Sequence, residues 1–167
     1  MNLLKTSLLA TVLFLTVTSC SKEETAEVQE ANISIDLNLA QETDWTMANE
    51  VLALVNDHRI AMGLSTIVRD QQYASAYAVE HTKYMIEMSQ INHDNFGDRS
   101  RALKDRGAES VGENVASGYD TAEALVTAWL SSPSHRRVLE GNYTHSGFGI
   151  MQNARGKYYF TQLFYRK

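Results

Sequence analysis

The strongest constraint on the fold is a change of sequence period along the chain. From residue 46 to residue 129 apolar side chains recur mostly at helical spacing, whereas residues 146–151 and 158–165 form two β-type runs. The segment that joins these runs, Asn-Ala-Arg-Gly at 153–156, is typical of a β-hairpin. Helices that come first and strands that come last predict an α+β domain, in which helices cover an antiparallel sheet.

The boundaries of these elements are marked by capping and breaking residues. Asp70 and Thr121 are good N-caps for the helices that follow them, and Pro133 ends a helix because it has no N–H for the helical ladder. The expected helices cover residues 46–61, 71–88, 99–106 and 121–129, with a short strand at 112–116 and a further helical turn after the proline.

The first residues predict export and anchoring rather than folding. Residues 1–19 carry Lys5 and an apolar run at 8–15 that is too short to span a membrane, which is the layout of a signal peptide. The sequence before Cys20, Val-Thr-Ser, resembles a bacterial lipobox, so Cys20 is the expected lipidation site. Residues 20–44 then read as an acidic, polar tether, and residues 45–167 as the folded domain. We therefore expect a protein of the bacterial cell envelope, lipid-anchored and extracytoplasmic, with surface exposure on the outer membrane left open.

Cysteine content and charge exclude several classes of function. Cys20 is the only cysteine, so disulfides, thiolate zinc sites and a cysteine nucleophile are excluded together. The formal net charge is −5, and the densest basic cluster, at residues 99–106, is interrupted by acidic side chains. We interpret that cluster, Arg99 included, as a solvated helix face and expect no nucleic-acid partner.

Four short segments stand in a fixed order: Ile-Asn-His at 91–93, Gly-Glu-Asn at 112–114, Trp-Leu-Ser-Ser-Pro-Ser-His-Arg at 129–136 and Gly-Phe-Gly-Ile at 147–150. Together with Val-Asn-Asp-His-Arg at 55–59 and Glu-His at 80–81, they resemble the CAP superfamily of SCP-like domains, in its bacterial, cysteine-free branch. The resemblance implies an α–β–α sandwich with a central antiparallel sheet and a cleft.

The resemblance also implies a site. In this family two histidines and a glutamate converge at the cleft and bind a divalent cation in some members; motif matching assigns these positions to His93, Glu113 and His135. Many eukaryotic members have a second glutamate just after the tryptophan, whereas no carboxylate occurs at 130–132. Two imidazoles and a carboxylate suit zinc, although three distant segments would have to assemble the site.

The alternatives to a metal site are a hydrolase and a structural network. Ser134 adjoins His135, but neighbouring residues in a helical turn point in different directions, and the chain has no Gly-x-Ser-x-Gly motif. A polar network of His93, Glu113 and His135 that fixes loops to the sheet accounts for the same residues without chemistry.

The remaining polar residues of these segments are given structural roles. Asn114 is expected to brace a loop, Trp129 to anchor the core and His81 to be a hydrogen-bonded core histidine. His58 and Arg59 are expected to cap the last carbonyl groups of the first helix, and His145 is given no role.

The sequence therefore favours binding over catalysis. The preferred function is a cleft that binds a small apolar or peptidic ligand, since lipid, sterol and peptide binding are all associated with the family. A peptidase or esterase that uses His93, Glu113 and His135, with or without zinc, is one alternative. A surface interaction protein that acts through the loops at 92–99 or 153–156 is another.

Overall fold

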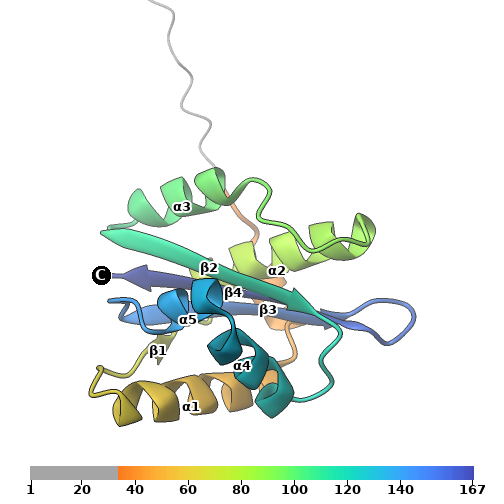
Figure 1. Ribbon diagram of the computed structural model, residues 1–167. Coiled ribbons are helices and arrows are strands. Elements are labelled where there is room, and N and C mark those ends of the chain that lie inside the picture. The colour runs from red at the N-terminus through yellow and green to blue at the C-terminus, as the bar shows by residue number, and fades with distance from the viewer. Residues whose placement is uncertain (1–33) are drawn as a thin grey trace, which may run out of the picture. The chain divides into compact units, whose positions relative to one another are not determined.

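The computed structural model describes residues 34–167 (Figure 1). The predicted signal peptide, Cys20 and the first part of the tether lie outside the described residues. Within residues 34–167, the helices are all too short or too polar to cross a bilayer.

The elements follow the order expected from the sequence, with helices first and the longest strands last. They are η1 (Leu37–Glu42), α1 (Trp45–Ala61), β1 (Val68–Arg69), α2 (Tyr73–Glu87), α3 (Phe96–Lys104), β2 (Ser110–Ser117), α4 (Ala122–Ser131), α5 (Pro133–Leu139), β3 (His145–Gln152) and β4 (Tyr158–Arg166).

The four strands form one sheet in the order β1-β3-β4-β2. Strand β4 pairs antiparallel with both β2 and β3, and the predicted hairpin is present, with Gly156 in the left-handed region at φ +78°. The two-residue strand β1 pairs parallel with β3. The sheet is therefore mixed, and the expectation of a purely antiparallel sheet holds for its three long strands only.

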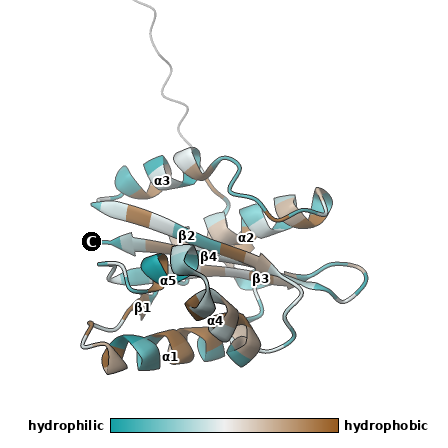
Figure 2. Cartoon of the chain, viewed as in Figure 1, coloured by the Kyte–Doolittle hydropathy of each residue, from teal (hydrophilic) through white to brown (hydrophobic). Residues whose placement is uncertain are grey.

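Helices cover both faces of the sheet, so residues 34–167 form the expected three layers (Figure 1). A large apolar cluster lies between the sheet and helices α1, α4 and α5, with Phe148, Phe160 and Trp129 at its centre. A smaller cluster joins the other face to α2 and α3. Helix α3 is mostly hydrophilic along its length, whereas α1 and α4 carry more hydrophobic residues (Figure 2), in keeping with their places on the smaller and larger clusters.

Strand β3 approaches α2 unusually closely. A Cβ added at Gly147 would lie 2.2 Å from the backbone carbon of Ala74, and one added at Gly149 would lie 2.2 Å from the carbonyl oxygen of Ala78. Glycine is required at both positions because any side chain would push the helix off the sheet. The Gly-Phe-Gly segment therefore fixes the distance between α2 and the sheet.

The folded unit begins earlier than the sequence predicts. Residues 35–44, assigned to the tether, include the helix η1, and Ala40 is fully buried there. The hydroxyl of Thr43 accepts a hydrogen bond from the backbone N–H of Ile150 at 2.8 Å. Asp44 then caps α1 by accepting from the N–H of Met47 at 3.0 Å. This segment packs on the domain, although its composition is that of a linker.

Of the two predicted N-caps, Thr121 is confirmed, whereas the N-cap of α2 is Gln72 and not Asp70. Thr121 accepts from the N–H of Ala124 at 3.2 Å. The first residue of α2 is Tyr73, later than expected, yet the Asp70 carboxylate still accepts from the N–H groups of Gln72 and Ala74.

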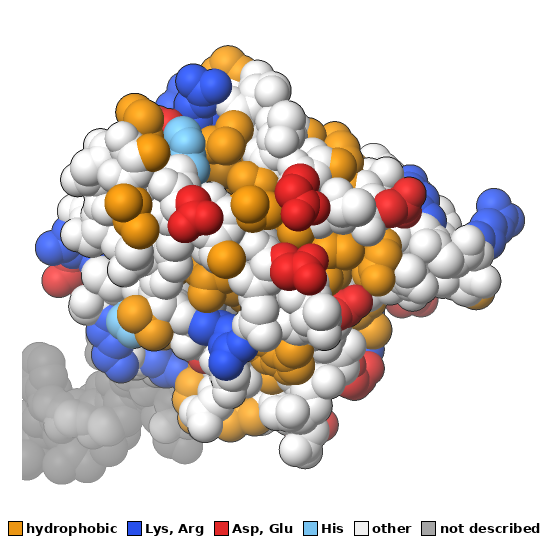
Figure 3. Space-filling view, turned by 90° about the horizontal axis from the view of Figure 1, so that it is seen from below, with side chains coloured by type: hydrophobic (Ala, Val, Ile, Leu, Met, Phe, Trp, Pro, Cys, Tyr) orange, Lys and Arg blue, Asp and Glu red, His pale blue; other side chains and the backbone are white. Residues whose placement is uncertain are grey.

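Seen from the α1 side, carboxylate side chains lie across the middle of the surface and basic side chains lie mainly toward its margins (Figure 3).

Candidate functional site

Glu113 lies at the centre of the predicted site, and its carboxylate is fully engaged. The side chain is 1% exposed, and Arg99 of α3 donates to it through both Nε (2.8 Å, to Oε2) and Nη2 (2.9 Å, to Oε1). Arg99 also donates from Nη1 to the backbone carbonyl of Asp94 at 2.7 Å. A buried carboxylate needs such a partner, and the two-point contact with a guanidinium neutralises its charge and fixes its orientation.

His93 is held by the same carboxylate. Its Nδ1 lies 2.8 Å from Oε1 of Glu113, and its side chain is 53% exposed. An ionised carboxylate only accepts hydrogen bonds, so Nδ1 carries the proton of this contact. In the tautomer that this contact selects, the lone pair lies on the other ring nitrogen, Nε2. The arrangement fixes one face of His93 to the protein and leaves half of the side chain open to solvent.

His135 reaches the site from α5, on the opposite face of the sheet. Its backbone carbonyl accepts a hydrogen bond from Nδ2 of Asn114 at 3.2 Å, and its ring lies 6.4 Å from the ring of Trp129. Burial lowers the pKa of His135, and a positive charge on His93 would lower it further.

Strand β2 is an outer strand of the sheet, so its side chains on both faces lie at the border of the sheet. Adjacent residues of a strand point to opposite faces, so Glu113 points toward α3 and Asn114 toward α5. His93 and His135 therefore flank the outer strand from either side. His93 and Glu113 are thus in direct contact, whereas His135 lies on the other side of β2 and is joined to that strand through Asn114.

These residues do not form a ready metal centre. Within residues 34–167 no three His, Cys, Asp or Glu side chains are grouped so that they could hold a metal ion. Glu113 in particular is occupied by a guanidinium, which disfavours a dication at the same oxygens. As arranged here, the side chains do not fit a three-ligand site, and zinc binding remains a prediction.

The structure corrects the interpretation of Arg99. The sequence places it on a solvated helix face, but it is 5% exposed and bonded to Glu113. A signal was available, because Arg99 shares its helix face with Ala102 and Leu103, both buried, whereas Arg101 is exposed. Spacing on the helix could have separated Arg99 from its basic neighbours, although it could not have identified Glu113 as the partner.

The other predicted polar residues divide into two groups. His81 is a core histidine as expected, 3% exposed and bonded through Nε2 to the carbonyl of Asn92 at 2.8 Å. Trp129 is buried, also as expected. Asn114 does not brace a loop: it lies in β2 and donates to the backbone carbonyl of His135 in α5.

His58 and Arg59 do not cap their own helix. His58 lies 2.9 Å from the Glu140 carboxylate, and Arg59 donates to the carbonyls of Ser65, Leu139 and Gly141. Both side chains point across to the next turn and to the end of α5, because Arg59 is buried and finds its acceptors there. They therefore tie α1 to α5 instead of ending α1.

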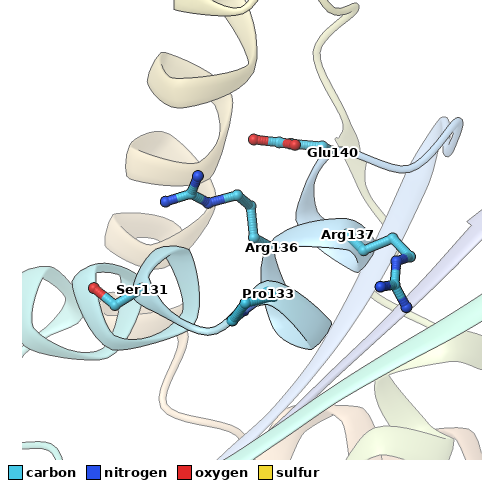
Figure 4. Close-up of a pocket in the computed structure, with 5 residues that line it drawn as sticks. All are labelled: Ser131, Pro133, Arg136, Arg137 and Glu140. Carbon is cyan, nitrogen blue, oxygen red and sulfur yellow. The ribbon is translucent and has the colours of Figure 1, made fainter.

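A hollow of about 400 Å³ lies at the junction of α4 and α5, the helix that carries His135 (Figure 4). The side chains of Arg136 and Arg137 point in different directions from α5, and Glu140 lies near its end (Figure 4). Arg136 is bound through Nε to the carbonyl of Leu130 at 2.6 Å. These contacts join α5 to α4 and thereby fix the backbone position of His135.

Comparison with models of known protein families identifies the family of this chain. The model of the CAP, or cysteine-rich secretory protein, family matches residues 52–164. The chain belongs to the CAP family. The match runs from within α1 to within β4 and includes His93, Glu113 and His135.

Individual CAP relatives agree with this assignment. YkwD of Bacillus subtilis strain 168 is 29% identical over 109 residues, which are 62% of this chain and 42% of that protein. The chain therefore spans about two fifths of that relative's length. An outer surface protein of Borrelia burgdorferi has a similar structure, with a TM-score of 0.65 and 24% identity over 73% of this chain and 93% of that one. An extracellular protein of Bacillus anthracis that contains an SCP domain is also similar, with a TM-score of 0.63 and 28% identity over 77% of this chain and 43% of that one. The shared CAP fold confirms the three-layer arrangement.

Proposed function

We propose that this CAP domain is an extracytoplasmic binding module whose site, at His93 and His135, takes a peptidic ligand. The signal-peptide pattern supports export, and the two structural relatives are an outer surface protein and an extracellular protein. Attachment to the membrane through a lipid on Cys20 is part of this proposal.

The observation that carries the proposal is the two-point contact between Arg99 and Glu113. Because hydrogen bonds from Arg99 and His93 already occupy both carboxylate oxygens, Glu113 is not free to act as a nucleophile or as a general base. It acts on His93, which it orients with Nε2 directed away from the contact. Orientation of a polar group by a buried neighbour is an arrangement for recognition.

A peptide group matches what the two histidines offer. A neutral imidazole has one hydrogen-bond donor and one acceptor, and an amide likewise has one N–H and one carbonyl. His93 presents an acceptor at Nε2, and His135 stays neutral because burial lowers its pKa. An apolar ligand would leave these groups without partners, which costs free energy. The polar site therefore favours the peptidic alternative over the apolar one.

Hydrolysis finds less support in the same region. The hydroxyl of Ser134 lies 3.1 Å from the hydroxyl of Ser132, and the two are hydrogen-bonded in an exposed turn. A serine nucleophile needs a base within hydrogen-bond reach, whereas the partner of Ser134 in this turn is another serine.

A metal at the two histidines is the second candidate, favoured by the contact between His93 and Glu113. Histidines that bind metals commonly donate their other ring N–H to a carboxylate, which orients the ring. Here Nδ1 of His93 donates to Glu113, so Nε2 of His93 and the imidazole of His135 would be the ligands. A bound zinc ion would act as a Lewis acid toward a ligand carbonyl.

Binding to an array of random heptapeptides tests the proposal. Peptides bound by the wild-type protein should bind about tenfold more weakly to His93→Gln and His135→Gln, since each variant removes one hydrogen bond. His145→Gln is the matched control, because this half-buried histidine stacks on Tyr165, at 4.9 Å, away from the site. Equal binding by all four proteins would refute a site at His93 and His135.

Calorimetric titration with zinc distinguishes the second candidate. One ion bound by the wild-type protein and lost in both His93→Ala and His135→Ala would establish a metal site. Peptide binding that persists in the presence of a chelator would show that recognition does not need the metal.

A further inference from the structure

A second surface of the domain has the chemistry of a binding site. Helices α2 and α3 enclose a hollow of about 350 Å³, lined by Tyr77, Glu80, His81 and Tyr84 of α2 and, on the α3 side, by Asn95, Asp98 and Arg99. Its volume falls within the range of about 300–1,000 Å³ that small-molecule sites occupy. We call it the α2–α3 groove.

Negative charge surrounds the mouth of the α2–α3 groove. Glu80 and Asp98 are exposed, and the hydroxyl of Tyr84 donates to a third carboxylate, Asp94, at 2.9 Å. The pKa of Tyr84 is raised, first by that hydrogen bond and then by burial and by the charges of Asp94 and Glu87. A positively charged group would therefore be attracted to this opening.

The cations already near the groove are committed to other partners. Arg99 is paired with Glu113 through two hydrogen bonds, so its charge is compensated behind the groove. Arg101 lies 3.5 Å from Asp98, but both side chains are more than half exposed, and such pairs contribute little. His81 has a lowered pKa, mainly because of burial, and is neutral near pH 7. Arg106 acts on the lining residue Tyr77 through its charge and a side-chain hydrogen bond. The carboxylates at the mouth, Glu80, Asp94 and Asp98, still outnumber the cations there.

Helix α2 already holds one guanidinium group against a tyrosine ring. The guanidinium carbon of Arg106 lies 4.3 Å from the ring centroid of Tyr73, one turn before Tyr77 on α2. Cations are attracted to the faces of tyrosine rings in this geometry. Further along the same helix, the half-buried ring of Tyr84, stacked on His81 at 6.0 Å, offers an aromatic surface to the groove.

We propose that the α2–α3 groove binds the basic side chain, Lys or Arg, of a peptide ligand. The carboxylates of Glu80 and Asp98 would pair with the cationic group, and Tyr84 would pack against its alkyl chain. Asn95, which lines the groove, lies two residues after His93, so we expect one peptide to reach both surfaces. That the cation belongs to a peptide rests on the proposed function, whereas cation binding by the groove does not.

A small probe tests the groove alone. In ¹H–¹⁵N spectra of the full-length protein, N-acetyl-lysine methylamide should shift amide signals of Glu80, Tyr84 and Asp98, with an affinity on the order of millimolar. N-acetyl-norleucine methylamide has the same chain without the charge and should bind at least about fivefold more weakly. Equal shifts from the two probes, or no shifts in α2 and α3 from the lysine probe, would overturn the proposal.

Charge variants locate the interaction. Glu80→Gln with Asp98→Asn removes both charges at nearly constant shape from exposed positions, and should weaken lysine binding at least about fivefold, as should about 1 M salt. Glu123→Gln, an exposed carboxylate of α4, is the matched control and should bind as the wild type does. Unchanged lysine binding in the double variant would refute the assignment.

The two proposals can fail separately. His93→Gln should bind the lysine probe normally, because the groove does not use that residue. A lysine probe that binds in the groove while no array peptide binds would refute the peptide function and leave the groove standing. Array peptides whose binding is unaffected when Lys is replaced by norleucine would refute the groove as a peptide site and leave His93 and His135 standing.

Discussion

Arg99→Met is the most decisive single change, because it leaves a buried carboxylate without its cation. The side chains of Arg99 and Glu113 are 6% and 1% exposed, and two hydrogen bonds of 2.8 and 2.9 Å join them. Removal of one partner from a buried ion pair costs about 3–5 kcal/mol of unfolding free energy. With a urea m-value of about 1.5–2 kcal/mol/M, the unfolding midpoint should fall by roughly 2–3 M.

The double variant Arg99→Met with Glu113→Leu separates the pair from its parts. Removal of both charges leaves no unpaired ion, so the double variant should be more stable than Arg99→Met by at least about 2 kcal/mol. Arg101→Met, on the exposed side of the same helix, should change stability by less than about 0.5 kcal/mol. A loss below about 1 kcal/mol in Arg99→Met, or strictly additive losses in the double variant, would contradict the argument.

Three further changes have defined outcomes. The folded protein lowers the pKa of His135, so this residue contributes stability above its unfolded pKa that is lost on acidification. His135→Gln should therefore reduce the loss of unfolding free energy between about pH 7.5 and pH 5. Urea titrations that show the same pH dependence in the variant and the wild type would contradict this. Gly147→Ala should cost at least about 1–3 kcal/mol by thermal unfolding because its Cβ would overlap Ala74, whereas Gly97→Ala, in open space, should cost nothing; equal melting temperatures would refute the close approach. Asp44→Ala should cost about 1 kcal/mol by removing the cap of α1, and a melting temperature unchanged from the wild type would argue against that cap.

Most of the fold could be predicted because its signals are local. The helix start at Thr121 follows from a side chain that bonds to a nearby N–H group, and the hairpin at 153–156 follows from its turn residues. The helix η1 escaped prediction because its folding depends on α2 and β3, as the bond between Thr43 and Ile150 shows. Local composition there is polar, and only the packed structure makes it part of the domain.

The bonding around Glu113 could be predicted only in part. Motif matching named His93, Glu113 and His135, and their role as a site stays a prediction. The contacts of Glu113 depend on Arg99, which lies on a separate helix and whose charge suggested exposure. Partners that meet only through tertiary packing carry no local signal, so the bonds from Arg99 and His93 to Glu113 required the structure.

The position of β2 at the border of the sheet has a mechanical consequence. His93 lies in the segment between α2 and α3, His135 lies in α5, and both are bonded to β2 from its two faces. A ligand held by both would act as a clamp between the two outer layers, and sliding of either layer would change the span that it bridges. Because such a ligand binds only the folded chain, at about 100 times its dissociation constant it would add about 2.7 kcal/mol of stability. Resistance to unfolding thus becomes a measure of occupancy for this domain.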